Sequence, residues 1–421
     1  MIILKNGTYI DWQTLEFSQT DIVIDEGRDG KILFPSKEKN PGITTTIDCS
    51  GKFITKSFAN GHHHVYSALA LGMNAPAKNP ANFPEILQYI WWKLDKSLDP
   101  EMIRSSALAT AVACAKNGVT FVIDHHASPF AVKGSLGTIA KAFDEVGVGH
   151  LLCYEISDRD GHKIAEKGLV ETADYLAKRQ GLVGLHASFT VGDKTLKQAV
   201  ELAEQMKSGI HVHSAEDKSD EDHCELNYKM RVIERFANTG VLQFPKTILG
   251  HCIHLDKHER SLVEKSPAWI VQNPESNLNN KVGNFNSEGL GRNIMLGTDG
   301  MHSDMLRSAK TAFFSGHNYE SIDYAETYRR FRNVHTYLHS NGFSGDGENN
   351  LVVLNYDSPT PLTTNNFLRH FLFGIESRHV LHVISNGKLI VKNREITTVN
   401  EAEILEESRR QTQWLWDKMA K

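Results

Sequence analysis

The stretch "DPEMIRSSALATAVACAKNGVTFVID", residues 99–124, contains one complete helix-to-strand unit. Asp99 can cap a helix and Pro100 suits its first turn, and apolar residues then recur through "MIRSSALATAVACAK". Asn117-Gly118 ends the helix, and the apolar run "VTFVID" follows as a strand. The unit predicts alternating helices and strands, which is the pattern of an α/β protein.

Seven further apolar runs of strand length lie in the middle of the chain: "FITKSFANGHHH", "HLLCYEI", "LVGLHASFT", "GIHVHSAE", "KTILGHCIHL", "AWIVQN" and "NIMLGTD". Several of them are separated by segments of helix length. Together with "VTFVID" they predict a closed (β/α)8 TIM-like barrel. A doubly wound open sheet is the alternative, although no Gly-rich phosphate-binding loop follows any of these strands.

Both ends of the chain have the pattern of β structure. Short strands are expected at "MIILKNGTYI", "DIVIDEG" and "TTTIDCSGKFI", and "HVLHVISNGKLIVKNREI" predicts a hairpin that turns at Asn386-Gly387. We therefore expect residues 1–54 plus 366–400 to form one small β-sandwich domain, and residues 55–365 to form the barrel. Residues 401–421 predict an amphipathic C-terminal helix that packs against the body or against another subunit.

The bulk composition excludes several classes of protein. Of 421 residues, 40% are hydrophobic, which is enough for a substantial core, and the net charge of -5 argues against nucleic acid as a partner. The five cysteines are scattered without CxxC spacing, which favours reduced thiols. No segment is long and apolar enough to span a bilayer. We expect a soluble cytoplasmic protein with no membrane partner.

Metal-capable side chains end most of the predicted strands, at the barrel edge where reactive groups gather. Six runs end in such residues: His62/His64, Asp124/His125/His126, His186, His213/Glu216, His251/His254 and Asp299. His62 and His64 share strand parity, so both can point inward while His63 points the opposite way. With His213 and Asp299 they supply three imidazoles and one carboxylate, which suits a catalytic divalent metal with a position left for water.

Zinc is the first expectation for this metal, and iron and manganese use overlapping ligands. The ion would lower the pKa of its bound water toward about 7 and so produce hydroxide at neutral pH. Glu216 lies three residues after His213, just past the strand end, where it could act as a proton shuttle. His251 could polarise the bond under attack or share a proton with Asp299.

The motifs "NGHHH", "HVHSAE", "LGHCIHL", "QNPESN" and "LGTDG" resemble the amidohydrolase superfamily, in its branch of cyclic amidine deaminases and chlorohydrolase-like enzymes. Longer stretches are similar to the SsnA group of aminohydrolases, which is associated with anaerobic purine and urate breakdown: "WWKLDKSLD", "DHHASPFAVKGSL", "CYEISDRDG", "GLHASFT" and "NPESNLNNKVG". The resemblance covers most of residues 55–365.

This resemblance implies one metal ion held by His62, His64, His213 and Asp299, with Glu216 as proton shuttle and His251 beside Asp299. It also implies that His186, in "GLHASFT", touches the substrate. This strand offers a histidine where binuclear relatives have a lysine, so one metal ion is expected. Relatives are commonly dimers or larger, so a homo-oligomer is expected. The sequence departs from the family at Lys56-Ser57, where Pro-Gly is usual, and we expect this to loosen a turn without removing a ligand.

Substrate contacts are less constrained by the sequence. His125 and His126 are adjacent, so only one can face the interior, and we favour His125. Asp158 and Arg159, in the loop after "CYEIS", could hold a polar ring, and a solvated loop pair is the alternative.

Other polar or aromatic residues favour structural interpretations. His211 shares parity with His213, and we expect it to support the site from below the metal. Trp91-Trp92 lie on a predicted helix, where core packing is favoured over substrate stacking.

These features predict a metal-dependent hydrolase that deaminates a purine-like or related heterocycle by attack of metal-bound hydroxide. Ring-opening hydrolysis of a cyclic amide uses the same groups and is the alternative. A non-catalytic binding protein is the third hypothesis, which the presence of both Glu216 and Asp299 disfavours.

Overall fold

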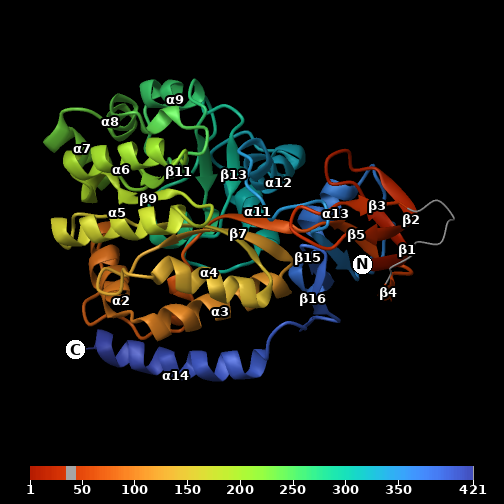
Figure 1. Cartoon of the computed structure of the whole chain (residues 1–421). Coiled ribbons are helices and arrows are strands. Elements are labelled where there is room, and N and C mark those ends of the chain that lie inside the picture. The colour runs from red at the N-terminus through yellow and green to blue at the C-terminus, as the bar shows by residue number, and fades with distance from the viewer. Residues whose placement is uncertain (35–43, 421) are drawn as a thin grey trace.

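The computed structural model describes residues 1–34 and 44–420, which form three sheets surrounded by helices (Figure 1). Two of the sheets are entirely parallel, and the third is a mixed sheet built from both ends of the chain. Within the described residues, no helix combines the length and apolar composition needed to cross a membrane. The chain therefore has the α/β architecture that its alternating pattern predicts.

Eight parallel strands build the first two sheets, in the orders β6-β7-β8 and β13-β12-β11-β10-β9. Isolated parallel bridges join the edges of these sheets: His63 pairs with Asp299 beyond β13, and Ile156 pairs with Leu185 of β9. Each edge of the smaller sheet is thus bridged to the larger one. The strands are β6 (Phe58–His63), β7 (Val119–His126), β8 (Gly149–Tyr154), β9 (Val183–Ala187), β10 (Ile210–Ser214), β11 (Ile248–His251), β12 (Trp269–Gln272) and β13 (Ile294–Leu296).

Helices follow each of these strands and lie around them in Figure 1. The predicted unit at residues 99–124 is confirmed: α3 (Pro100–Lys116) begins where Asp99 Oδ1 accepts hydrogen bonds from the Glu101 and Met102 amides. The other helices of this region are α4 (Ser135–Val146), α5 (His162–Leu176), α6 (Asp193–Gln205), α7 (Lys218–Tyr228), α8 (Val232–Thr239), α9 (Lys257–Glu264), α10 (Pro274–Asn280), α11 (Met305–Gly316) and α12 (Tyr324–Ser340).

The segment between β6 and α3 is irregular. It contains α1 (Phe83–Ile86), a π-helical stretch at Leu87–Trp91 and α2 (Trp92–Ser97). Short 3-10 turns occur here and elsewhere, at Val65–Ala70, Ser188–Thr190, Val241–Gln243 and Ser377–His379.

The third sheet joins the two ends of the chain, with the order β17-β16-β15-β14-β5-β1-β2-β3 and with β4 beside β1. The predicted hairpin is confirmed, because Asn386 and Gly387 connect β15 to β16 with φ of 49° and 74°, as a two-residue turn of this kind requires. The strands are β1 (Ile2–Ile10), β2 (Phe17–Ile24), β3 (Ile32–Leu33), β4 (Thr45–Asp48), β5 (Phe53–Lys56), β14 (Leu351–Leu354), β15 (Val380–Ser385), β16 (Lys388–Lys392) and β17 (Glu395–Ile396).

One strand of this sheet comes from within residues 55–365, the segment expected to form the barrel. β14 pairs with β5 on one side and with β15 on the other, so residues 351–354 belong to the mixed sheet. Its four residues are all buried and apolar, which suits a strand with neighbours on both sides. α13 (Phe367–Phe373) then separates β14 from β15.

Lys56, which stands where the family usually has proline, is buried at the end of β5. Its Nζ lies 2.9 Å from Asp346 Oδ1 and donates to the Gly347 carbonyl at 2.6 Å. Asp346 Oδ2 is in turn 2.7 Å from His335 Nδ1. A buried cation is costly unless it is paired. The ion pair with Asp346, which precedes β14 in the chain, therefore compensates for the burial of the Lys56 ammonium group.

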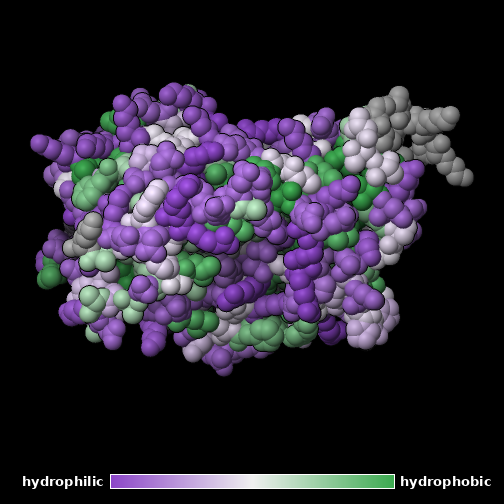
Figure 2. Space-filling view, turned by 90° about the horizontal axis from the view of Figure 1, so that it is seen from below, coloured by the Kyte–Doolittle hydropathy of each residue, from purple (hydrophilic) through white to green (hydrophobic). Residues whose placement is uncertain are grey.

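The C-terminal helix α14 (Glu401–Met419) runs along α3 at the bottom of Figure 1. Leu415 is fully buried and Trp416 Nε1 donates to the Leu69 carbonyl at 3.0 Å, whereas Trp414 is about half exposed. The helix thus packs against the body, as one of the two expected alternatives. Figure 2 views this face from below and shows apolar residues in small groups separated by polar ones.

Candidate active site

The predicted metal-capable residues converge at the ends of the parallel strands. His62 and His64 lie at the end of β6, His213 lies in β10, His251 ends β11, and Asp299 follows β13. All five are less than one-tenth exposed. The polypeptide is in the left-handed region at His251 (φ 68°) and at Asp299 (φ 56°). These turns redirect the two side chains from the strand direction toward the histidines.

The donor atoms of these residues lie close together. His64 Nε2 is 3.0 Å from Asp299 Oδ1, His62 Nε2 is 3.6 Å from the same oxygen, and His213 Nε2 is 3.4 Å from His62 Nε2. Two of the clusters able to hold a metal ion are His62/His64/Asp299 and His62/His213/His251. The four residues predicted as ligands are thus brought together around His62.

Neighbouring groups orient two of the imidazoles. His64 Nδ1 is 2.6 Å from the His125 carbonyl oxygen, to which only an N–H can donate, so Nε2 is the ring nitrogen that faces Asp299. Burial lowers the pKa of His64, but the Asp299 carboxylate outweighs it and raises this pKa to about 9, so a metal ion would replace a proton at Nε2. His62 Nδ1 is 2.9 Å from His211 Nε2, which places His211 beneath the cluster. Burial lowers the pKa of His62 to about 3, so its imidazole is neutral near pH 7. Neutral imidazoles with an outward lone pair are the form that binds metals.

Asp299 is held from two sides. Its Oδ2 accepts a hydrogen bond from Ser276 Oγ at 2.6 Å, and its backbone carbonyl accepts one from His63 Nδ1 at 2.5 Å. His63 therefore points away from His62 and His64 and contacts the Asp299 backbone. This arrangement leaves Asp299 Oδ1 directed at the histidines.

Glu216 and His251 form a second group beside Asp299. His251 Nε2 lies 3.5 Å from Glu216 Oε2 and 3.8 Å from Asp299 Oδ2, and its Nδ1 is 2.8 Å from Asn277 Oδ1. Burial raises the pKa of the Glu216 carboxyl to about 7. A carboxyl with a pKa near neutrality can both take up and release a proton at physiological pH, as a proton shuttle requires.

A cavity lies over these groups, and the empty space within it and its open mouth amounts to about 770 Å³. Aromatic and acidic side chains dominate its wall. The aromatic ones are Tyr66, Phe83, Trp91, Trp92 and Phe189, and the acidic ones are Asp95, Glu155, Glu216, Asp217, Asp220 and Asp299. The wall also includes His64, Leu87, Arg159, His186, His213, Ser276, Asn280 and Met301.

Two of the four predicted substrate contacts line this cavity. His186 does so with Nδ1 bonded to Thr190 Oγ1 at 2.7 Å, and Arg159 does so while its guanidinium lies 5.2 Å above the Trp92 ring. Arg159 also pairs with Asp95.

The other two predicted contacts lie outside the cavity wall. Asp158 is occupied by the protein, because its carboxylate accepts from the Gly192 amide at 2.8 Å and from Thr195 Oγ1 at 2.9 Å. His125 has no exposed surface and lies beneath the wall, between Glu155 Oε1 and the His211 carbonyl. His125 does face inward, in agreement with the preference for it over His126. It is not among the residues that line the cavity, so this position does not support direct contact with a substrate.

Several wall residues were not predicted from the sequence. Trp91 and Trp92 pack against buried apolar residues, as favoured, but they also line the cavity. Asp95 and Glu155 line it as well. Glu155 directly follows β8, so its position at a strand end was a usable signal. Asp95 and the tryptophans lie on the irregular helical segment, whose path over the strand ends is not encoded in a local pattern.

The amidohydrolase family model matches residues 53–339. The chain is 23% identical over 400 residues to a 5-methylthioadenosine/S-adenosylhomocysteine deaminase of Syntrophomonas wolfei, with 86% of this chain and 87% of the relative covered. It is 28% identical over 344 residues to a 5'-deoxyadenosine deaminase of Methanopyrus kandleri, with 75% and 77% covered. Its fold is similar to the crystal structure of an adenosine deaminase from Xanthomonas campestris with bound zinc, at a TM-score of 0.84, 17% identity and 98% coverage of each chain. Because the family model spans more than half of its length, the chain belongs to the amidohydrolase family of hydrolases.

Proposed function

We propose that this chain is a metal-dependent aminohydrolase that hydrolyses a C–N bond of a purine-like nitrogen heterocycle and releases ammonia. The observation that carries the proposal is the convergence of His62, His64, His213 and Asp299 beneath a cavity of about 770 Å³. Relatives named as deaminases of adenosine compounds support a purine-like ring as the substrate.

The residues present fit one divalent cation. His62, His64 and Asp299 offer donor atoms within 4.8 Å of one another, and His62 forms a second such group with His213 and His251. In His62 and His64, Nε2 faces Asp299 Oδ1, while Nδ1 contacts His211 and the His125 carbonyl, respectively. We propose His62, His64, His213 and Asp299 as the ligands, with zinc as the first candidate and iron or manganese as alternatives with overlapping ligand preferences.

The proposed roles of the chain's own groups follow from their positions. A cation held by these residues would lower the pKa of a water molecule, so that hydroxide is available at neutral pH. Glu216 takes up the proton of the attacking water and delivers it to the departing nitrogen, a transfer that its near-neutral pKa supports. His251, oriented through Asn277, donates or accepts a hydrogen bond beside Asp299. Arg159 and His186 contact the substrate ring from the cavity wall.

The test is a panel of purines, their reduced or oxidised forms and hydantoin-like rings, assayed with zinc-loaded protein for both ammonia and product mass. Deamination releases ammonia and exchanges nitrogen for oxygen, whereas ring opening of a cyclic amide adds one water and releases none. Product masses with added water and no ammonia would replace our proposal by the ring-opening alternative. No turnover of any compound by protein carrying one equivalent of metal would refute both.

We also propose that the eight parallel strands form one closed (β/α)8 barrel, which the bridges between the two parallel sheets support. The mixed sheet is then a composite β domain of residues 1–54 and 366–400, to which we add β14. The β-sandwich form of this domain, a cytoplasmic location and a homo-oligomeric state remain predictions. Analytical ultracentrifugation of the purified chain tests the last of these.

A further inference from the structure

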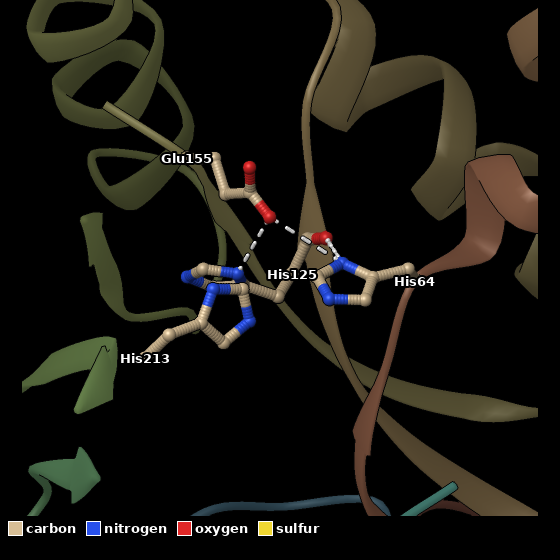
Figure 3. A group of neighbouring side chains, drawn as sticks. All are labelled: His64, His125, Glu155 and His213. Atoms are coloured by element: carbon tan, nitrogen blue, oxygen red, sulfur yellow. Dashed lines mark hydrogen bonds and ion pairs between the residues drawn. The ribbon is translucent and has the colours of Figure 1, made fainter. Parts of the chain in front are cut away.

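Glu155, directly after β8, has one committed oxygen and one open oxygen. Oε1 lies 3.0 Å from His125 Nδ1 and 3.4 Å from His64 Nδ1. Oε2 has no hydrogen-bond partner within residues 1–34 and 44–420, and Glu155 lines the cavity. Figure 3 shows this second oxygen directed away from the three histidines.

We propose that Glu155 is a specificity-determining residue that accepts a hydrogen bond from a ring N–H of the substrate. The substrate class is then a neutral or cationic heterocycle with an N–H donor on an edge away from the hydrolysed C–N bond. This inference rests on the proposed function, since it concerns the same cavity.

The carboxylate is held in one orientation by a rigid neighbour. His125 has no exposed surface, and its Nε2 lies 3.1 Å from the His211 carbonyl while its Nδ1 contacts Glu155. Because Nε2 faces a backbone carbonyl of β10, the ring cannot turn without losing that contact, and this keeps Nδ1 directed at Glu155 Oε1. A preorganised acceptor of this kind gives a ligand hydrogen bond without the cost of ordering a mobile side chain.

The position of Glu155 separates it from the proposed proton shuttle. Glu155 belongs to a cluster with His64, His125 and His213, whereas Glu216 clusters with His251 and Asp299, and the two clusters have no member in common. Both Glu155 and Glu216 line the one cavity. A ring attacked near Glu216 can therefore present its remote edge to Glu155.

The charge of the cavity narrows the substrate further. Its lining carboxylates are Asp95, Glu155, Glu216, Asp217, Asp220 and Asp299. The one arginine among the lining residues, Arg159, is paired with Asp95 and Asp160. Carboxylates outnumber cationic side chains in this lining, so an anionic substituent such as a phosphate would meet mainly like charge, which lowers affinity for such compounds.

The test uses equilibrium dialysis of metal-loaded protein with adenine, guanine, 9-methyladenine, 9-methylguanine and 1-methylguanine. Each methyl group replaces one ring N–H. In Glu155→Gln, the amide oxygen is expected to keep the His125 hydrogen bond, so its NH2 group would face the cavity and oppose a ligand donor. Asp217→Asn is the control, since it removes the same charge from the wall and asparagine also caps helices.

We expect wild type and Asp217→Asn to bind one methylated base about tenfold or more weakly than its parent. Glu155→Gln should bind that parent about tenfold more weakly and should not distinguish it from the methylated form. Its metal content should equal that of wild type. Parent bases that bind and show this pattern without being hydrolysed would support the inference while refuting the proposed function. Three results would overturn the inference about Glu155. Wild type and Glu155→Gln could bind the parent base equally well, the methylated base could still bind more weakly than its parent in Glu155→Gln, or neither parent base could bind.

Discussion

Replacing His63 with alanine tests how the chain holds Asp299 in place. His63 Nδ1 donates to the Asp299 carbonyl at 2.5 Å, and Nε2 lies 3.3 Å from Ser303 Oγ. Asp299 needs such support because its φ of 56° is unfavourable for a residue with a Cβ. In His63→Ala the buried carbonyl loses this partner, which should lower the free energy of unfolding by about 1–3 kcal/mol.

The effect on the metal should differ between affinity and capacity. His63 contributes no atom to the metal-capable clusters, so His63→Ala should still bind one equivalent of zinc when the metal is in excess. Its affinity should fall about 10–100-fold, as is typical when a group that orients a ligand is removed. In contrast, His62→Ala and His64→Ala should have a lowered metal content even at saturation. His63→Asn retains an N–H donor and should recover most of the affinity.

Chelator competition measures the affinity, elemental analysis after saturation measures the capacity, and thermal unfolding measures the stability. His63→Ala protein with wild-type affinity and stability would show that the contact with Asp299 has no positioning role. A loss of metal at saturation in His63→Ala but not in His62→Ala would overturn the strand register from which the ligands were inferred.

Three further predictions concern the proposed catalytic groups. Glu216→Gln should keep its metal by elemental analysis while kcat falls about 10²–10⁴-fold, and full turnover would remove the proton role. Glu216 must be unprotonated to act, and burial raises its pKa to about 7, so kcat/KM should fall as the pH drops through this value. A bound cation lowers the pKa of Glu216, so the fall should then occur at a lower pH. This acid limb should be missing from the residual activity of Glu216→Gln. Zinc at about 100 times its dissociation constant should stabilise wild type by about 2.7 kcal/mol in thermal unfolding but should leave His62→Ala unchanged.

Local patterns in the sequence predicted the parts of the fold that local physics decides. The cap at Asp99, the proline at the first helical position and the Asn386-Gly387 turn each act within a few residues, and each occurs as predicted. The pairing of β14 with β5 depends on residues that are about 300 positions apart in the chain. No periodicity of a buried apolar strand identifies its partner, and residues 351–354 were therefore left within the segment expected to form the barrel, with no strand named there.

The cavity wall could not be derived from the sequence for a related reason. On a regular α-helix, residues four apart rotate by roughly 40° per step, so a row such as Phe83, Leu87, Trp91 and Asp95 would drift off one face. All four nevertheless line the cavity, and the segment between Leu87 and Trp91 is π-helical, with a wider turn. The tryptophans also pack against buried apolar residues, as the sequence favoured. Their second role, in the cavity wall, depends on the irregular path of this segment.

Several residues at the strand ends, including proposed catalytic and metal-binding groups, have left-handed backbone conformations. Ala215, His251, Cys252 and Asp299 all have φ between 47° and 68°, which costs of order 1 kcal/mol or more for each residue with a Cβ. Hydrogen bonds from neighbouring strands hold these conformations: the Cys252 amide donates to the Ser214 carbonyl and the Asp299 amide to the His62 carbonyl, both at 3.0 Å. Strand parity assumes extended backbone, which these residues do not have. It can therefore identify the residues that reach the site, but it does not give the direction of their side chains. The neighbouring strand that supplies one proposed ligand also fixes the backbone of the next, so the fold and the site are specified by the same contacts.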